Sequence, residues 1–144
     1  MKSLIHNLDR KKVLLILEWC KKNFGRSRYH RKYPTLRVYK SKGNSAFAYR
    51  DGGLFGTYDH GVITIYLGSH DSMRELCKTV IHEYRHYLMS IREYNSLYKK
   101  MEREGSDPEE ISYEHPHEKD CEDFEDKWGE LCFSQLRKKL YKKD

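Results

Sequence analysis

A segment in the middle of the chain, His82–His86, has the pattern HExxH. On an α-helix, four residues rise about 6 Å and turn about 400°, so His82 and His86 would lie one above the other on one face. Two imidazoles in this arrangement can share one Zn²⁺ ion at about 2.0–2.1 Å. Glu83 would lie about 100° round the helix, where a carboxylate can act as a base on water without ligating the metal. The pattern therefore predicts a helix that carries a metal site.

The alternative to a metal site is a helix with two solvent-facing histidines. This alternative has to be considered because a random chain of this composition contains HExxH with a probability of roughly 0.04. Ser72 and Glu75 form the capping-box pattern of a helix start. Apolar residues then recur at helical spacing, at Met73, Leu76, Cys77, Val80, Ile81, Tyr84, Tyr87, Leu88 and Ile91. On a helical wheel their arc is centred opposite His82 and His86. The helix is thus expected to pack one face on a core and to turn both histidines away from it.

A catalytic zinc ion usually has three protein ligands and an open position, so a third ligand is needed. Pro116 suits the first position of a helix, and a stripe at helical spacing follows it: Cys121, Phe124, Trp128, Leu131, Cys132 and Gln135. Glu118 falls in the first turn, on the flank of this stripe, where its carboxylate can lean over a neighbouring helix. We expect Glu118 to be the third ligand, with Glu122, His117 and His115 as competitors. Alternatively, Glu118 only complements the helix dipole.

Two motifs in this order resemble those of the compact zincin metallopeptidases of the ImmA/IrrE type, to which many small phage-encoded proteins are also similar. The first motif is T-x-x-HExxH-Y-L, which begins at Thr79, and the second is P-x-E-x-x-C-x-x-F, which begins at Pro116. The resemblance covers roughly residues 45–128. The family usually has Ala at the position of Cys121, and it often has Gly at the position of Arg85.

The resemblance implies zinc bound by His82, His86 and Glu118, with Glu83 as the general base of peptide-bond hydrolysis. It also implies that an extended peptide substrate adds to an exposed edge of the sheet. The tetrahedral intermediate of such a reaction needs a donor beside the metal. The candidate donors are Tyr113, His115, His117 and Arg85, and the candidate acceptors for the ligand imidazoles are Glu122 and Glu125.

The remaining segments predict an α+β, zincin-like fold in a single domain over residues 1–144. Its expected parts are an N-terminal helix with a basic loop (1–34), a sheet (35–68), the active-site helix (71–100), an acidic loop (101–115) and a C-terminal helix (116–141). Strand signals at 36–39, 46–49, 54–58 and 62–67, separated by tight turns, predict a twisted sheet of three or four strands that is mostly antiparallel, with room for one parallel neighbour. His60 and His70 are expected to be loop residues and not ligands.

Charge is distributed unevenly along the chain. Residues 102–126 hold 12 Asp or Glu against Arg103 and Lys119, although the whole chain carries a net charge of +6. Basic residues gather toward both ends, at 26–32 and 137–143. A basic run that includes an aromatic residue can bind nucleic acid, whereas a solvated loop is the more common explanation. Nucleic acid is therefore a candidate partner beside a protein or peptide substrate.

Cysteine usage and hydropathy predict a location. The four cysteines form no CxxC pair, and the hydrophobic run Val13–Leu17 is only five residues long. These features predict a reducing, intracellular compartment, which is the cytoplasm, and no membrane span. If the protein is phage-encoded, the expected location is the host cytoplasm or a virion. No pattern indicates an oligomeric state.

The leading hypothesis from the sequence is a zinc-dependent endopeptidase. One alternative is a catalytically silent zincin-fold protein with a binding or structural role, in a virion or in regulation. Another is a protease associated with nucleic acid through its basic ends, similar to SprT-like enzymes. All three hypotheses use the same metal ligands.

Overall fold

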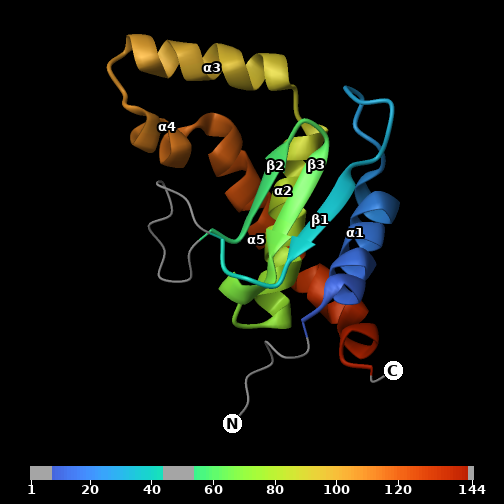
Figure 1. Ribbon diagram of the computed structural model, residues 1–144. Coiled ribbons are helices and arrows are strands. Elements are labelled where there is room, and N and C mark those ends of the chain that lie inside the picture. Colours follow the sequence, from blue (N-terminus) through green and yellow to red (C-terminus); the bar gives the residue numbers. More distant parts are fainter. Residues whose placement is uncertain (1–7, 44–53, 143–144) are drawn as a thin grey trace.

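The computed structural model describes residues 8–43 and 54–142, which form an α+β arrangement of helices around a small mixed sheet (Figure 1). The elements in chain order are α1 (Arg10–Phe24), β1 (Thr35–Tyr39), β2 (Gly56–Asp59), β3 (Val62–Tyr66), the 3₁₀ helix η2 (Leu67–Ser69), α2 (Met73–Leu88), α3 (Ile91–Arg103), α4 (Pro108–Glu114) and α5 (Pro116–Leu140). The α+β class was expected from the sequence. The strand expected at 46–49 lies outside the described residues.

The sheet has the strand order β1-β3-β2. Strand β1 is parallel to β3, and β2 is antiparallel to it. The described sheet is therefore mixed, with one parallel and one antiparallel pairing, and an isolated antiparallel bridge joins Gly43 to Leu54. The tight turn after Asp59 produces the antiparallel pair: His60 and Gly61 have φ angles of 46° and 84°, as a two-residue hairpin turn of type I′ requires. The parallel pair depends on a contact across a much longer stretch of chain.

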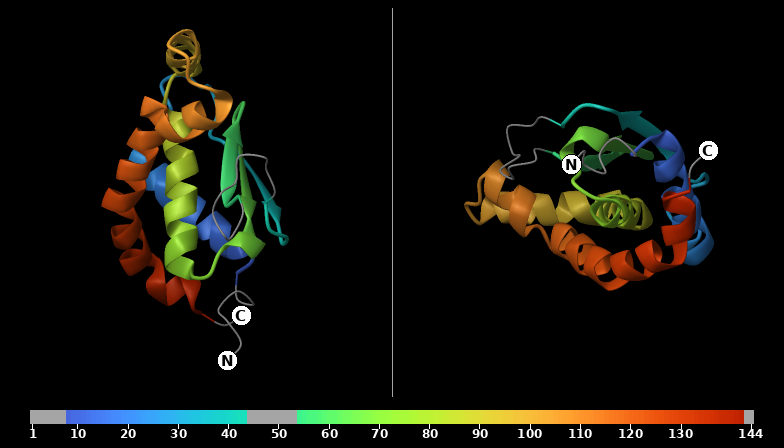
Figure 2. Two further views of the ribbon diagram at one scale, coloured as in Figure 1. Left: turned by 90° about the vertical axis from the view of Figure 1, so that its left-hand side faces the viewer. Right: turned by 90° about the horizontal axis from the view of Figure 1, so that it is seen from below.

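The helices pack in layers on one face of the sheet. Helix α2 lies between the sheet and α5, and α1 packs beside α2 (Figure 2). Strand β3 buries Ile63 and Ile65, and Thr64 between them is buried as well. The core is completed from the helices, chiefly by Ile16 and Leu17 of α1, Leu76, Val80, Ile81, Tyr84 and Tyr87 of α2, and Cys132, Leu136 and Leu140 of α5.

The helix expected over residues 71–100 is in fact two helices. Helix α2 ends at Leu88, and α3 begins at Ile91 after a sharp change of direction (Figure 1). Met89 has an extended backbone, and the Ser90 hydroxyl accepts a hydrogen bond from the backbone N–H of Glu93 at 3.2 Å. A second helix-start signal therefore interrupts the apolar periodicity that predicted one helix.

The expected acidic loop at 101–115 contains the short helix α4. Asp107 and Glu110 form a capping box at its start, with Pro108 at the first helical position. None of the helices in the described residues combines the length and the apolar character that a membrane crossing requires. All four cysteines are buried and none of them forms a disulfide.

Candidate metal centre and catalytic cleft

Helix α2 turns both histidines of the HExxH motif away from the core. Its start is fixed by Ser72, whose hydroxyl accepts from the backbone N–H of Glu75 at 3.1 Å. Tyr84 and Tyr87, on the opposite face, are fully buried. The side chains of His82 and His86 retain 12% and 17% exposure, and their ring centroids lie 5.3 Å apart. The predicted orientation of this helix is thus confirmed.

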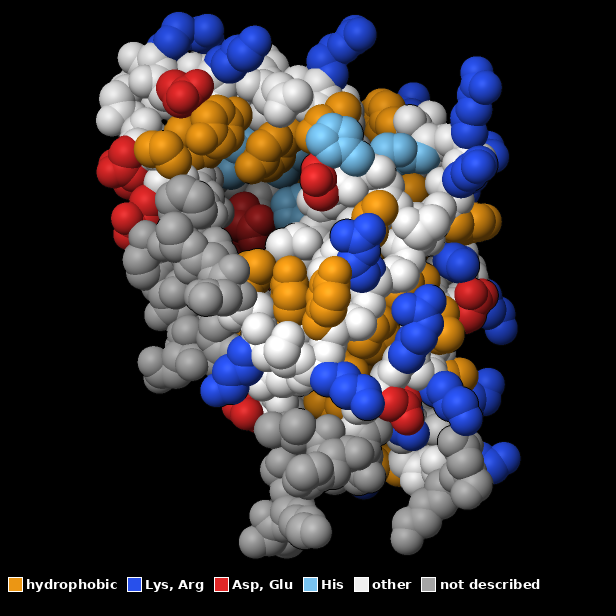
Figure 3. All heavy atoms as spheres, in the orientation of Figure 1, with side chains coloured by type: hydrophobic (Ala, Val, Ile, Leu, Met, Phe, Trp, Pro, Cys, Tyr) orange, Lys and Arg blue, Asp and Glu red, His pale blue; other side chains and the backbone are white. Residues whose placement is uncertain are grey.

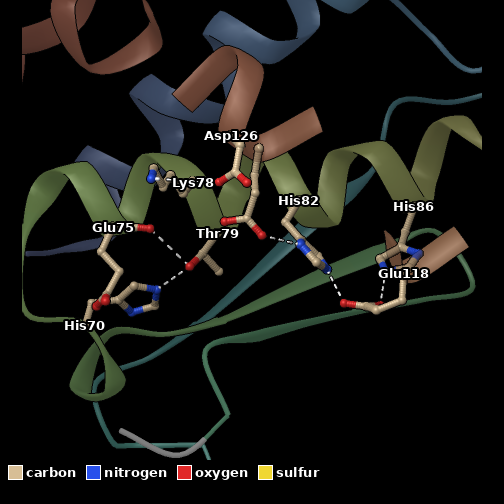
Figure 4. A network of polar contacts seen from close by, with 9 residues as sticks. His70, Glu75, Lys78, Thr79, His82, His86, Glu118 and Asp126 are labelled. Carbon is tan, nitrogen blue, oxygen red and sulfur yellow. Dashed lines mark hydrogen bonds and ion pairs between the residues drawn. The ribbon is translucent and has the colours of Figure 1, made fainter. Parts of the chain in front are cut away.

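Glu118, in the first turn of α5, lies between the two imidazoles (Figure 4). Its Oε1 atom is 2.6 Å from Nε2 of His82, and its Oε2 atom is 3.0 Å from Nε2 of His86. The Pro116 start of α5 places this carboxylate over α2, because the two helices pack closely along their length. The structure therefore brings together the three side chains expected to hold a metal.

The other ring nitrogen of His82 also has a carboxylate partner. Its Nδ1 atom lies 2.7 Å from Oε1 of Glu125, which is two turns beyond Glu118 on α5. An acceptor at Nδ1 fixes the orientation of an imidazole and directs Nε2 at a metal. Of the two acceptors considered from the sequence, Glu122 and Glu125, it is Glu125 that occupies this position.

The charges of this cluster are strongly coupled. Burial of the His82 ring lowers its pKa, but hydrogen bonds to Glu118 and Glu125 outweigh that effect and raise the pKa to about 11. Burial raises the pKa of Glu118, but the hydrogen bonds from His82 and His86 outweigh it and hold the pKa well below its usual range. At neutral pH the metal-free cluster therefore pairs a protonated His82 with an ionised Glu118.

Glu83 borders the same cleft but does not contact Glu118 through a hydrogen bond. It is 7% exposed, and burial raises the pKa of its carboxyl although His82 and His86 oppose the shift. A carboxyl whose pKa moves toward neutrality can both accept a proton and return it. This is the property that a general base needs, and it agrees with the role expected for Glu83.

The cluster forms one wall of a cavity of about 430 Å³. Strand β2, the end of α2, the start of α3 and the start of α5 supply most of its lining, which includes Gly56, Tyr58, His82, Glu83, His86, Ile91, Tyr94, His117 and Glu118. In Figure 3 acidic and histidine side chains are visible inside a hollow of the surface. The candidate ligands thus face a space that a substrate can enter.

The donor set fits a zinc ion. Two imidazoles and a carboxylate are typical zinc ligands, and tetrahedral bonds of about 2.0–2.1 Å hold the donors about 3.3–3.4 Å apart. The contacts of Glu118 with His82 and His86, at 2.6 and 3.0 Å, are shorter because hydrogen bonds take the place of the ion. An ion between Glu118 and either imidazole would therefore move these donors slightly apart.

A second donor set shares both histidines. One ligand atom from each of His82, His86 and Cys121 lies within 4.8 Å of the others. Cys121 follows Glu118 by one turn on α5, is fully buried and does not line the cavity. Burial raises the pKa of its thiol, which disfavours the thiolate that binds metal. The geometry and exposure favour Glu118 as third ligand and leave Cys121 as a further donor behind it.

The histidines beside Glu118 occupy different positions. His115 is fully buried; its Nε2 atom is 2.9 Å from the carbonyl oxygen of Tyr94, and its Nδ1 atom accepts from the backbone N–H of His117 at 3.0 Å. Both ring nitrogens are thus engaged inside the protein, which argues against His115 as a ligand or a donor to substrate. His117 lines the cavity, and its Nε2 atom lies 3.1 Å from a carboxylate oxygen of Glu93.

Two other candidate donors lie outside the cavity. Tyr113 on α4 is 40% exposed and is not among the lining residues. Arg85 points to α5, where its Nε and Nη2 atoms bind the carboxylate of Asp120 at 2.8 and 3.2 Å. The geometry therefore disfavours both side chains as stabilisers of a developing negative charge in the cleft.

His60 and His70 match the expectation that they serve the loops. His70 is buried, with Nδ1 2.8 Å from the carbonyl of Tyr66 and Nε2 2.8 Å from the hydroxyl of Thr79 (Figure 4). His60 is in the β2–β3 turn, where its ring contacts Asp59, and it also lines the cavity. Within the described residues, neither ring makes a hydrogen bond or an ion pair with His82 or Glu118.

Tyr94 is a cleft residue that the sequence did not indicate. Its ring stacks on His115 with centroids 3.9 Å apart and meets His117 edge-on at 5.7 Å. Burial and the charge of Glu118 raise the pKa of its hydroxyl, which therefore stays protonated and able to donate. Its only sequence signal is the apolar spacing of α3, which does not show that α3 turns back over the cleft.

Comparison with protein-family models, with curated proteins and with solved structures finds no match to this chain. The functional argument therefore rests on the geometry and chemistry of the cleft.

Proposed function

We propose that the protein is a zinc-dependent endopeptidase with a gluzincin-like His-His-Glu site. The observation that carries the proposal is the Glu118 carboxylate, which bridges Nε2 of His82 and Nε2 of His86 beside a cavity of about 430 Å³. Three donors that converge at an open cleft leave a coordination position for water or substrate, which is the arrangement of a catalytic and not a structural zinc site.

The roles of the chain's own residues follow from their positions. A zinc ion in this position supplies Lewis-acid polarisation of a carbonyl group and lowers the pKa of water. Glu83 takes a proton from the attacking water and delivers it to the leaving amine. Its raised pKa helps the second transfer, since a weakly basic carboxylate would hold no proton to return.

Two side chains can donate to the oxyanion that forms in peptide hydrolysis. Tyr94 and His117 both line the cavity near Glu118, and each is held in place by neighbours outside it. Glu93 orients the His117 ring, and the stacked His115 orients the Tyr94 ring. His117 was expected from the sequence to have this role, whereas Tyr94 replaces Tyr113 as the tyrosine candidate.

Strand β2 is the element best placed to hold an extended substrate. Among the described residues it is an edge strand of the sheet, and its residues Gly56–Asp59 line the cavity that also holds the candidate metal ligands. An edge strand offers unpaired backbone groups to which a peptide can add as one more strand. A peptide bound there would run past Glu83 and the candidate zinc site.

The proposal is tested by metal content and by cleavage of an unfolded peptide library. Protein purified without added metal should hold about one zinc ion per chain. Glu83→Gln should keep the metal and cleave nothing, while Glu109→Gln, a matched change at an exposed acid of α4, should cleave normally. If cleavage persists after the metal is removed with a chelator and also persists in Glu83→Gln, the proposal is wrong.

The position of Cys121 favours a second candidate, a catalytically silent protein whose metal stiffens a binding or structural domain. If His82, His86, Glu118 and Cys121 all ligate one ion, the site is a closed four-ligand structural site. Under this alternative Cys121→Ala loses the metal. Under the peptidase proposal the variant keeps both metal and activity, because Cys121 lies behind the open cleft.

A further inference from the structure

One long segment of the chain carries positive charge without any acidic residue. Between Glu18 and Asp51 the sequence has ten Lys or Arg and no Asp or Glu. The part of this segment that the structure describes includes the α1–β1 loop and strand β1. Its exposed cations in that part are Lys22, Arg26, Arg28, Arg31, Lys32, Arg37, Lys40 and Lys42.

These cations are not neutralised within the described residues. The ion pairs that Lys and Arg make there involve Lys21, Lys78, Arg74 and Arg85, and none of the eight exposed cations takes part. Arg26 donates to the backbone carbonyl of Arg31 at 3.0 Å, and Arg28 lies over the ring of Tyr29. The positive charge of this segment is thus available to an anionic partner.

The loop and strand β1 adjoin the face of the sheet on which no helix of the described residues packs (Figure 2). All the helices that pack on the sheet lie on its other face (Figure 2). The register pairs Arg37 with Thr64 and Tyr39 with Tyr66, so these residues share the face opposite Ile63 and Ile65, where Thr64 is buried between its neighbours. Figure 3 views this face, where Lys and Arg side chains surround exposed hydrophobic ones and acidic groups are few.

Aromatic rings lie among the cations. Tyr39 and Tyr66 stack with centroids 5.6 Å apart and an interplanar angle of 16°, which leaves Tyr39 44% exposed. Tyr29 and Tyr33 of the adjoining loop are 52% and 44% exposed, and each has a cation over one face of its ring, Arg28 over Tyr29 and Lys21 over Tyr33. An exposed tyrosine ring leaves apolar surface in contact with water, and it offers a face on which an unpaired base can stack.

We propose that this basic sheet face, formed by Arg37, Tyr39, Lys40, Lys42 and Tyr66 with the loop residues Arg26, Arg28, Tyr29, Arg31, Lys32 and Tyr33, binds single-stranded nucleic acid. Unpaired cations meet the phosphates, and the tyrosine rings stack with unpaired bases. A duplex keeps its base faces inside the helix, so it can use the cations but not the rings. An anionic membrane favours an amphipathic helix that inserts apolar side chains, whereas these rings lie on a sheet.

Most of this surface lies apart from the candidate peptidase site, and the two adjoin at the α1–β1 loop, where His30 lines the cavity. Strand β1 is one edge of the sheet, and the cavity is lined from β2 at the other edge. It also differs from the basic last turn of α5, where Lys138 and Lys139 complement the helix dipole. The binding of nucleic acid can therefore be present or absent independently of zinc and of peptide cleavage.

The test is fluorescence anisotropy of the purified protein with labelled oligo-dT, oligo-rU and a duplex, each about 15 units long. We expect both single strands to bind more tightly than the duplex, and affinity to fall roughly 30- to 100-fold between about 50 and 200 mM salt. The two single strands distinguish DNA from RNA. No binding at low salt, equal binding of the duplex, or binding only to phosphatidylserine vesicles would each overturn the proposal.

Matched variants locate the surface. Arg37→Glu should weaken binding about tenfold and reduce the salt dependence, and Tyr39→Ala should weaken it at least about fivefold with the salt dependence unchanged. Lys138→Glu, the same reversal of charge at an exposed site on α5, should have little effect. If Lys138→Glu weakens binding as much as Arg37→Glu, the charge acts diffusely and the basic sheet face is not the site. Circular dichroism of each variant confirms that it is folded.

Discussion

Glu125 contacts His82 on the side of the ring away from Glu118: its Oε1 atom lies 2.7 Å from Nδ1 of the imidazole. The same ring thus contacts two carboxylates of one helix, one at each nitrogen. Because Nδ1 is engaged, Nε2 is directed at the cleft. The α2–α5 pair supplies the candidate ligands and also the group that orients one of them.

Removal of this orienting carboxylate should weaken zinc binding without abolishing it. Glu125→Gln retains the shape of the side chain but not its charge, and losses of about 10- to 100-fold in metal affinity are typical of such changes. Competition with a chromophoric chelator measures the affinity. Asp126→Asn is the matched control, because Asp126 is the next residue of α5 and is exposed. An equal loss in both variants would assign the effect to net charge.

Zinc binding should release a proton near neutral pH. The pKa of His82 is raised to about 11 in the metal-free protein, so this imidazole is protonated at pH 7 and must lose its proton to ligate the ion. The apparent affinity should therefore rise about tenfold per pH unit over the neutral range. Calorimetry in two buffers with different ionisation enthalpies counts the protons released. A count of zero at pH 7 would contradict the assignment of His82 as a ligand.

The metal-free protein should be stabilised by this cluster only within a limited pH range. The folded pKa of His82 is raised, so its contribution is complete below the unfolded value of about 6.5 and is lost as the pH rises toward about 11. The folded pKa of Glu118 is lowered, so its contribution is present above about 4.3 and is lost as the pH falls below it. The free energies of unfolding of wild type and Glu118→Gln, measured by urea titration, should differ most between about pH 4.3 and pH 6.5. The difference should shrink as the pH rises from there toward about 11 or falls below about 4.3.

The parts of the site that depend on local spacing could be predicted from the sequence. His82 and His86 share a face because they are one turn apart, and Glu118 reaches them because Pro116 fixes where its helix begins. The opposite, apolar face of α2 determines which way the histidines point. Their convergence on one carboxylate is observed, whereas zinc and catalysis stay predictions.

The parts that depend on contacts between distant segments could not be predicted. The parallel pairing of β1 with β3 joins strands that are separated by β2 in sequence, and no turn residue encodes it. Tyr94 enters the cleft because the chain breaks at Ser90 and its ring then stacks on His115. Cys121 belongs to the apolar stripe of α5, so its distance from the histidines was apparent only after the helices were packed.

Close packing of α5 on α2 should control both stability and metal binding. A Cβ atom at Gly129 would lie 2.6 Å from Cγ of Lys78, which is too close, so Gly129→Val must displace one of the helices or the stem of that lysine. We expect a loss of about 1–3 kcal/mol in the free energy of unfolding. If α5 is displaced, zinc affinity should also fall several-fold, because Glu118 and Glu125 are on this helix.

The control for this change is Lys127→Val, at an exposed site two residues earlier on the same helix. It introduces the same β-branched side chain, whose helix propensity costs up to about 0.7 kcal/mol, without crowding α2. Urea unfolding and chelator competition measure both variants. If Gly129→Val and Lys127→Val lose equal stability and bind zinc equally well, then the close approach of the helices at Gly129 does not hold the acidic residues against His82.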